Sequence, residues 1–331
     1  MKEIAAIVAD LTAPANLPGV LATLVSVEGS SYRRPGARLL LKADGSRTGS
    51  VSGGCLEEDV LARAAKILRS GQPETVVYDT TAENDLVWGV GLGCHGVVRV
   101  LLERIATPPS WAQALAKNLT LRRPTELSVL FSQEDVTTMG TRLAAPGDCG
   151  DPERLFADRI EPPTALVIFG AGDDAQPLAR LAKELGWTVT VADPRAAYAN
   201  PQRFPGVDRV IAGPVERLVT DIAMDRATAV AVMTHHYMHD LPLLKVLITR
   251  NLAYLGLLGP RKRADKILAD LAADGAGVAP EHRARLRAPI GLDLGADGPE
   301  QVALSIVAEI QAELAGRDAR PLRLRERPIH G

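Results

Sequence analysis

The residues with the clearest chemical potential in this chain are a cysteine and the two glycines before it. Gly53 and Gly54 have no Cβ, so a ligand can approach their backbone closely. Cys55 opens an amphipathic pattern, which predicts its thiol in the first turn of a helix. There the helix dipole favours anions and lowers a thiol pKa, although acids at positions 57–59 oppose this. The segment is typical of a site for an anion, a soft metal or a sulfur-bearing cofactor, or of a cysteine buried as a small hydrophobe.

Two further clusters in the N-terminal half could contribute to the same site. Cys94 is also bracketed by glycines, but it lies too far from Cys55 in the sequence for a CxxC motif. The two thiols could still meet in space near a soft metal. A cationic turn with Arg33, Arg34 and Arg38 could complete an anion pocket beside the Gly-Gly-Cys segment.

A glycine-rich turn between an apolar strand and a helix begins the second half. Gly170 and Gly172 fit the fingerprint that lets a phosphate approach a helix N-terminus. Asp193 ends the next strand, where an acid can bind a ribose hydroxyl. Asp173 and Asp174 place two negative charges beside the phosphate position and disfavour a pyrophosphate. The turn predicts the fold and leaves open whether it binds a nucleotide.

The carboxyl ends of later strands carry histidines and cations, at the edge where open α/β sheets bind ligands. His235 and His239 are four residues apart, so one helical face could hold both near a metal. An uncharged histidine hydrogen-bonded to Asp240 as a structural cap is the alternative. Further on, Arg261 and the two cations after it follow a proline at a helix start and could clamp a phosphate.

The elements that must position these residues fall into two parts. Residues 1–132 mix strands and helices without regular alternation and predict an α+β domain. Residues 133–163 are rich in proline and glycine and indicate a linker. Residues 164–316 alternate strand and helix patterns, which predicts a doubly wound, Rossmann-like parallel sheet and an α/β protein. Residues 317–331 form an Arg-rich tail that we expect to be loose.

Composition excludes several classes of protein. Apolar residues make up 46% of the 331 residues and the net charge is −2, which is typical of a globular protein without the basic excess of a nucleic-acid binder. No apolar run reaches 18 residues, so we expect no membrane span. Three cysteines argue against a disulfide framework and indicate a reducing, cytoplasmic location; we assign no role to the third, Cys149.

Taken together, these motifs resemble the XdhC/CoxI family, the accessory factors of xanthine dehydrogenase and related molybdenum hydroxylases. The resemblance covers nearly the whole chain, and several long motifs occur in the family's order. In the first half they are Gly29–Ala37, Gly49–Glu57 and Gly91–Cys94. In the second half they are the Gly170–Gly172 turn with Asp193–Arg195, Thr234–His235 with Asp240, Tyr254–Gly259 and Pro289–Asp293.

The resemblance implies a chaperone rather than an enzyme. Members of the family bind molybdopterin-type cofactor, protect its sulfurated form and deliver it to an apo-hydroxylase. The family also implies contact with a cysteine desulfurase and a homodimer. Carried over by motif, Cys55 is the first candidate for cofactor binding and Cys94 the second, while Gly53 and Gly54 admit the cofactor. The phosphate is our own assignment, to Arg33, Arg34 and Arg38.

Two departures from the family pattern and one rival function bear on the second half. Many members have histidine where this chain has Asp173, and glycine where it has His95. Both departures suggest a subgroup whose client differs from xanthine dehydrogenase itself. The rival is an NAD(P)-dependent oxidoreductase that uses the Rossmann half, with His235 as acid and base. Candidate ligand residues at this edge are Gly170, Gly172, Asp193, His235 and Arg261.

Overall fold

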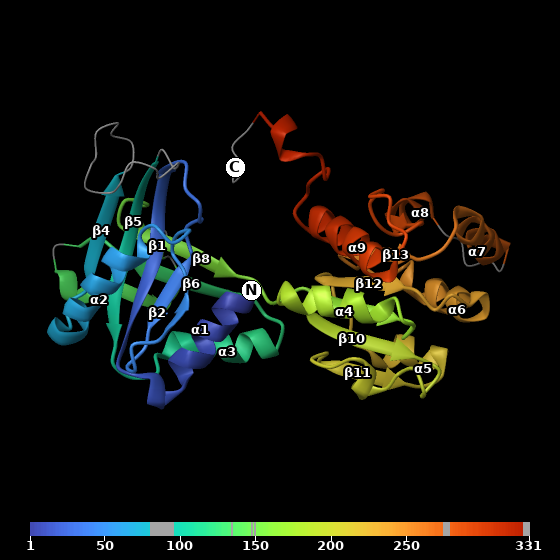
Figure 1. Cartoon of the computed structure of the whole chain (residues 1–331), viewed down its shortest axis with the longest axis horizontal. Coiled ribbons are helices and arrows are strands. Elements are labelled where there is room, and N and C mark those ends of the chain that lie inside the picture. The colour runs from blue at the N-terminus through green and yellow to red at the C-terminus, as the bar shows by residue number, and fades with distance from the viewer. Residues whose placement is uncertain (80–95, 134, 147, 149, 274–278, 327–331) are drawn as a thin grey trace. The chain divides into compact units, whose positions relative to one another are not determined.

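The computed structural model describes residues 1–79, 96–133, 135–146, 148, 150–273 and 279–326 (Figure 1). The chain forms two compact units. Unit 1 comprises Met1–Pro162 together with the end of the chain from Glu326, and unit 2 comprises Pro163–Arg325. Each has its own hydrophobic core, so each is described separately. Within the described ranges, no helix is long and apolar enough to cross a membrane.

Unit 1 is built on a five-stranded antiparallel sheet in the order β3-β2-β1-β5-β4. Alternating apolar side chains of these strands face helix α2 on one side and helices α1 and α3 on the other. The strands are β1 (Gly19–Gly29), β2 (Arg38–Leu41), β3 (Arg47–Gly49), β4 (Glu74–Asp79) and β5 (Gly96–Ile105), and the helices are α1 (Lys2–Thr12), α2 (Glu57–Ser70) and α3 (Ser110–Thr120).

A second, three-stranded sheet in unit 1 contradicts the predicted linker over residues 133–163. Strands β7 (Gly140–Leu143) and β8 (Leu155–Ile160) both pair antiparallel with the central strand β6 (Thr125–Leu130). Of the described proline and glycine residues that suggested a linker, Gly140 begins β7, Pro146, Gly150 and Pro152 lie between β7 and β8, and Pro162 follows β8. The segment is therefore part of the first unit, which ends at Pro162.

Unit 2 confirms the predicted Rossmann-like sheet. Six parallel strands lie in the order β11-β10-β9-β12-β13-β14. The strand order changes direction between β9 and β12, because β10 and β11 lie on one side of β9 and the later strands lie on the other. A crevice at the carboxyl ends of two such strands is the usual ligand site of this architecture. The strands are β9 (Ala165–Phe169), β10 (Thr188–Asp193), β11 (Arg209–Ala212), β12 (Thr228–Val232), β13 (Tyr254–Leu257) and β14 (Leu286–Arg287).

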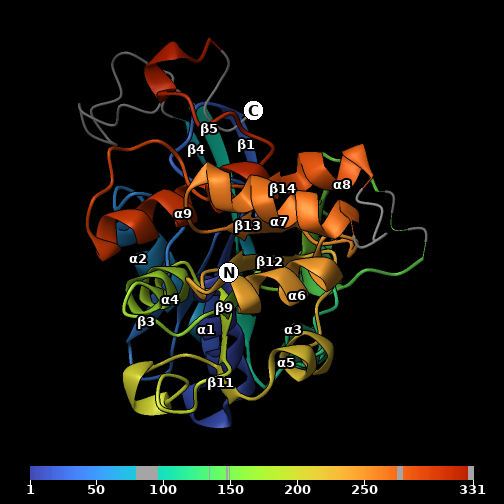
Figure 2. The ribbon, with the colours of Figure 1, turned by 90° about the vertical axis from the view of Figure 1, so that its right-hand side faces the viewer.

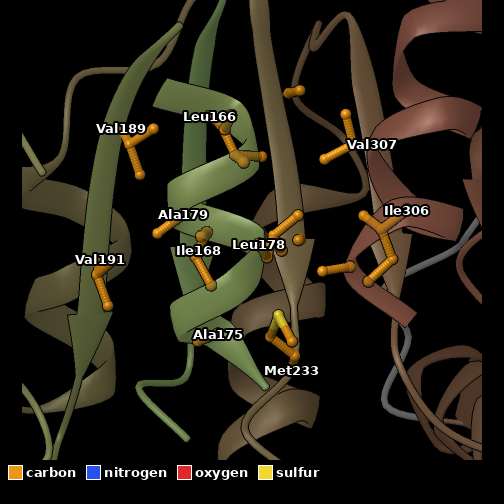
Figure 3. Close-up of a cluster of buried hydrophobic side chains, with 14 of the residues drawn as sticks. Leu166, Ile168, Ala175, Leu178, Ala179, Val189, Val191, Met233, Ile306 and Val307 are labelled. Atoms are coloured by element: carbon orange, nitrogen blue, oxygen red, sulfur yellow. The ribbon is translucent and has the colours of Figure 1, made fainter. Parts of the chain in front are cut away.

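Helices cover both faces of this sheet, as its continuously apolar strands require. Figure 2 shows α4 and α9 on one side and α5 and α6 on the other. Figure 3 shows part of the core beneath α4 and α9, to which Leu178 of α4 and Ile306 of α9 contribute together with Ile168 of β9 and Val191 of β10. The helices are α4 (Ala175–Glu184), α5 (Val215–Asp221), α6 (Tyr237–Leu247), α7 (Arg261–Ala273), α8 (Pro280–Arg285) and α9 (Pro299–Leu314), and short 3-10 turns span Pro14–Asn16, Val136–Thr138, Pro201–Arg203 and Leu322–Leu324.

Candidate functional site

Cys55 lies in the loop before helix α2, and not in its first turn as predicted. Leu56 is the N-cap and Glu57 the first helical residue. The reason is local: Gly54 has a φ of +112°, and the chain completes its turn before the helix begins. The thiol is exposed, so the alternative of a cysteine buried as a hydrophobe is also wrong. An exposed thiol on a glycine turn is accessible to a ligand.

A buried hydrogen-bond network fixes the Cys55 loop. The Ser52 hydroxyl accepts the N–H groups of Gly54 (3.0 Å) and Leu56 (3.1 Å) and donates to the Glu57 carboxylate. Glu57 is 6% exposed and also accepts the Ser52 N–H at 2.9 Å. Burial by itself raises the pKa of Glu57, but the hydrogen bonds from Ser52 and Ser50 outweigh it and leave that pKa below its usual value. Glu57 therefore points inward, away from its predicted role of opposing thiolate formation.

An aromatic ring that the sequence motifs did not single out lies against this loop. Tyr32 is 65% exposed, and a Cβ on Gly53 would sit 3.3 Å from its ring. A side chain at position 53 would press on the ring and require a small shift, whereas the space above Gly54 is open. A cavity of about 420 Å³ lies here, between Tyr32, Arg47 and the loop. Tyr32 stands within the Gly29–Ala37 motif, which is the signal that could have identified it.

A larger cavity of about 620 Å³ adjoins the first and shares Tyr32 and Arg33 with it. The first turn of α1, residues 32–38 and strand β8 form its walls. All three predicted arginines line it, but in different states: Arg33 pairs with Glu3, Arg38 is 3% exposed and pairs with Asp158 at 2.8 Å, and Arg34 is exposed. The structure thus places the predicted basic turn beside the Cys55 loop.

The second candidate cysteine, Cys94, lies outside the described residues. Its pairing with Cys55 stays a prediction. The residues described around the first cysteine therefore define the candidate site on their own: an exposed thiol, a fixed glycine turn, an exposed aromatic ring and an arginine-lined cavity.

At the edge of the Rossmann sheet, Asp193 is engaged within the protein. Its carboxylate is fully buried and accepts the Ala171 N–H at 2.7 Å, together with the N–H, Nε and Nη2 of Arg195 at 2.8–2.9 Å. Burial raises the pKa of Asp193, but these donors lower it below its usual value. Four donors fill the lone-pair directions of a carboxylate. Asp193 therefore has no acceptor free for a ribose, contrary to its predicted role.

The acids and histidines at this edge pair with neighbouring groups. Asp173 pairs with Arg203, and Asp174 accepts a hydrogen bond from His235 at 2.6 Å. His235 has the left-handed φ of +58°, and the Asp174 contact raises its pKa. The alternative of a histidine hydrogen-bonded to Asp240 is not found among the described residues, because the carboxylate of Asp240 accepts from Thr234 and Arg263.

The two predicted histidines do not share a helical face, because His235 precedes helix α6 and His239 lies within it, and the three cations of the predicted clamp do not all face solvent. His239 lies 4.5 Å from the ring of His236, and no group of three potential metal ligands occurs among the residues that the structure describes. Asp240 is fully buried, accepts the Thr234 hydroxyl at 2.6 Å and pairs with Arg263. Arg263 thus faces inward, while Arg261 at the start of α7 stays exposed.

Two family profiles match this chain. The XdhC Rossmann domain matches residues 166–310, and the XdhC and CoxI family matches residues 13–79. The first match covers the parallel sheet from β9 to α9. The second covers the Cys55 loop, helix α2 and the basic turn, so the two matches include both regions described above.

Individual proteins are similar over nearly the whole length. A probable xanthine dehydrogenase subunit from Bacillus subtilis (strain 168) is 36% identical over 88% of this chain and 92% of its own length. The molybdenum cofactor insertion chaperone PaoD of Escherichia coli (strain K12) is 26% identical over 88% of this chain and 82% of its own. A crystal structure described as a xanthine dehydrogenase from Bacillus halodurans superposes with a TM-score of 0.81 and 31% identity, over 97% of this chain and 99% of that one.

Proposed function

Since the chain belongs to the XdhC and CoxI family, we propose that it binds molybdenum cofactor and delivers it to a molybdenum hydroxylase of the xanthine dehydrogenase type. The similarity to a cofactor insertion chaperone supports a role as an accessory protein rather than an enzyme. The observation that carries the proposal for a binding site is the exposed Cys55 thiol on its fixed glycine turn, beside the smaller of two adjoining cavities.

The Cys55 loop has the properties that a reversible cofactor site needs. A thiol is a soft ligand suited to molybdenum or to sulfur-bearing groups. Ser52 and Glu57 hold the turn in place before binding, so little ordering of the chain opposes association. Gly53 and Gly54 leave the backbone open to close approach, and the exposed face allows the cofactor to leave again. The same loop can therefore accept the cofactor and release it.

Finer features of the family belong to this proposal as well. We propose that the bound cofactor is the sulfurated form, that a cysteine desulfurase supplies the sulfur, and that the protein acts as a homodimer in the cytoplasm. Cys94 is the second proposed cofactor ligand. The Rossmann edge, with Gly170, Gly172 and Arg261, is proposed as a docking region for the partner enzyme.

The rival proposal, an NAD(P)-dependent oxidoreductase, finds no support in the observed geometry of the Rossmann edge, because Asp193 is occupied by Ala171 and Arg195. A tight native-state ligand raises the melting temperature. Millimolar NAD or NADP should therefore leave the melting temperature unchanged. A clear rise would restore the oxidoreductase hypothesis.

Cofactor retention tests the proposed function directly. The protein is incubated anaerobically with isolated molybdenum cofactor, desalted, and assayed for bound molybdenum and pterin fluorescence. We expect near-stoichiometric retention in the wild type, its loss in Cys55→Ala and full retention in the matched variant Cys149→Ala. Equal retention in Cys55→Ala and wild type would move the site away from Cys55, and no retention by the wild type would remove the function.

A further inference from the structure

The larger cavity of unit 1 has walls from three separate elements. The first turn of α1, the Tyr32–Arg38 turn and strand β8 line this open cavity, whose volume is about 620 Å³. Four arginines and three carboxylates line it, so positive side chains are in excess. The positive end of the α1 dipole adds to this potential. The cavity is thus suited to an anion.

Arg38 is the buried cation of this cavity and is incompletely satisfied. Its side chain is only 2% exposed, its Nη1 donates to the Gly36 carbonyl at 3.0 Å, and it forms an ion pair with Asp158 at 2.8 Å. Its Nε and Nη2, and the Asp158 Oδ2 of the ion pair, have no hydrogen-bond partner in the part of the chain that the structure describes. Buried donors without acceptors are costly and rare in native proteins. An oxygen acceptor from outside the chain, from water or from an anion, would give these donors a partner.

The other three arginines differ in how far they are already engaged. Arg33 pairs with Glu3, and Arg159 pairs with both Glu126 and Glu161. Arg34 is exposed at the cavity wall, and no ion pair of its side chain is found among the described residues. Arg34 and Arg38 are therefore the two cations with donors available to a ligand. Paired N–H donors of this kind match the oxygens of a phosphate.

We propose that this cavity binds a phosphate group through Arg34 and Arg38. The inference rests on the proposed function and deepens it: the phosphate is that of the molybdopterin cofactor. Tyr32 stands at the boundary of the two cavities, so its ring can stack on the pterin while the phosphate lies at the arginines. Cys55 directly follows Gly54 in the wall of the smaller cavity, and we assign it to the sulfur-bearing side of the cofactor.

The affinity for a phosphorylated pterin, compared with that for the same pterin without its phosphate, tests the phosphate site separately from the Cys55 thiol. The probes are the fluorescent, oxidised pterin of the cofactor and the same pterin after its phosphate has been removed by a phosphatase. Charge-assisted hydrogen bonds predict that the wild-type protein binds the phosphorylated form about tenfold more tightly. Inorganic phosphate at millimolar concentration should weaken binding of that form alone.

Arginine variants test whether Arg34 and Arg38 cause the preference for the phosphorylated pterin. Arg34→Ala should bring the ratio of the two pterin affinities close to one. Arg38→Lys keeps the charge beside Asp158 but loses the planar guanidinium, so it should reduce this ratio. Arg69→Ala removes an exposed arginine of α2 outside the cavity and should keep the full preference. This control has the same change of charge as Arg34→Ala in the same unit.

The outcomes separate this inference from the proposed function. Equal binding of the two pterins by wild type overturns the phosphate site, and a preference that persists in both Arg34→Ala and Arg38→Lys overturns its assignment to this cavity. In either case the function stands if intact cofactor is retained in the desalting assay. If neither pterin binds, the phosphate site falls, and retention of intact cofactor alone decides the proposed function.

Discussion

Glu57 is the residue through which the Cys55 loop is joined to helix α2. It begins the helix, and its buried carboxylate accepts hydrogen bonds from Ser50 and Ser52 on the other side of the loop. The sequence pattern predicts that the Glu57 carboxylate faces solvent beside the Cys55 thiol, because acids in the first turn of a helix normally face solvent. The hydroxyls that turn it inward are visible in the Ser-Val-Ser-Gly-Gly-Cys motif, but only the folded loop brings them together.

Glu57→Gln should destabilise the protein in a pH-dependent way. The pKa of Glu57 is lowered on folding, so its ionised form contributes stability above its ordinary, unfolded pKa of 4.5, and that stability is lost as the pH falls through the folded pKa. At neutral pH we expect a loss of about 1–3 kcal/mol in the free energy of unfolding. Urea unfolding at neutral pH and below pH 4 measures both values.

The matched control for this prediction is the neighbouring acid. Glu58 is exposed in the same helical turn, so Glu58→Gln should change stability by less than about 0.5 kcal/mol at either pH. A Glu57→Gln variant as stable as Glu58→Gln at neutral pH would contradict the role of Glu57 in holding the loop.

His235 provides a second residue-level prediction, at the Rossmann edge. The hydrogen bond to Asp174 raises the pKa of His235 above 6.5, so the charged pair is present at low pH and is lost as the pH rises through the folded pKa. Asp174→Asn should therefore lower the His235 pKa measured by NMR titration of its ring. Asp173→Asn, a change of the neighbouring acid that pairs with Arg203, should not. The same titration in both variants would contradict the assigned contact.

At the scale of elements, the two halves differ in how well the sequence predicts them. Strands such as β9 and β12 are continuous apolar runs bounded by glycine or polar turns, so periodicity identifies them. Strands β7 and β8 are short, half-exposed edges, and hydrogen bonds to β6 rather than their own pattern define them. The segment between them has the composition of a linker, and only pairing distant in sequence shows that it is folded. For the same reason, the sequence pattern does not identify Asp158 of β8 as the partner of Arg38.

The buried carboxylate of Glu103 anchors strand β7, which lies in the segment that composition suggests is a linker. The N–H of Thr141 donates to Glu103 at 3.0 Å and its hydroxyl donates to the other carboxylate oxygen. Burial raises the pKa of Glu103 despite these bonds. Thr141→Val leaves one buried oxygen without its hydroxyl donor, which should cost about 1–3 kcal/mol in the free energy of unfolding.

Thr137→Val, at an exposed position of the same segment, should cost less than about 0.5 kcal/mol. Equal, small effects in urea unfolding would mean that residues 133–163 behave as a linker.

At the scale of the whole molecule, the chain divides its proposed tasks between two units. The thiol, the exposed tyrosine and the arginine-lined cavity all belong to Met1–Pro162. In Pro163–Arg325 the polar groups of the sheet edge that usually bind ligands satisfy one another: Asp193 with Arg195, Asp174 with His235 and Asp240 with Arg263. A Rossmann fold thus does not by itself indicate nucleotide chemistry.

This division predicts that the two units fold and function separately. Each has its own apolar core, formed around α1, α2 and α3 in one and around α4, α6 and α9 in the other. Fragments cut between Pro162 and Pro163 should therefore each unfold in one cooperative transition in urea. Fragment 1–162 should retain cofactor after desalting, and fragment 163–331 should not. Retention by the second fragment alone would place the site at the Rossmann edge, and retention only by the intact chain would mean that both units build it.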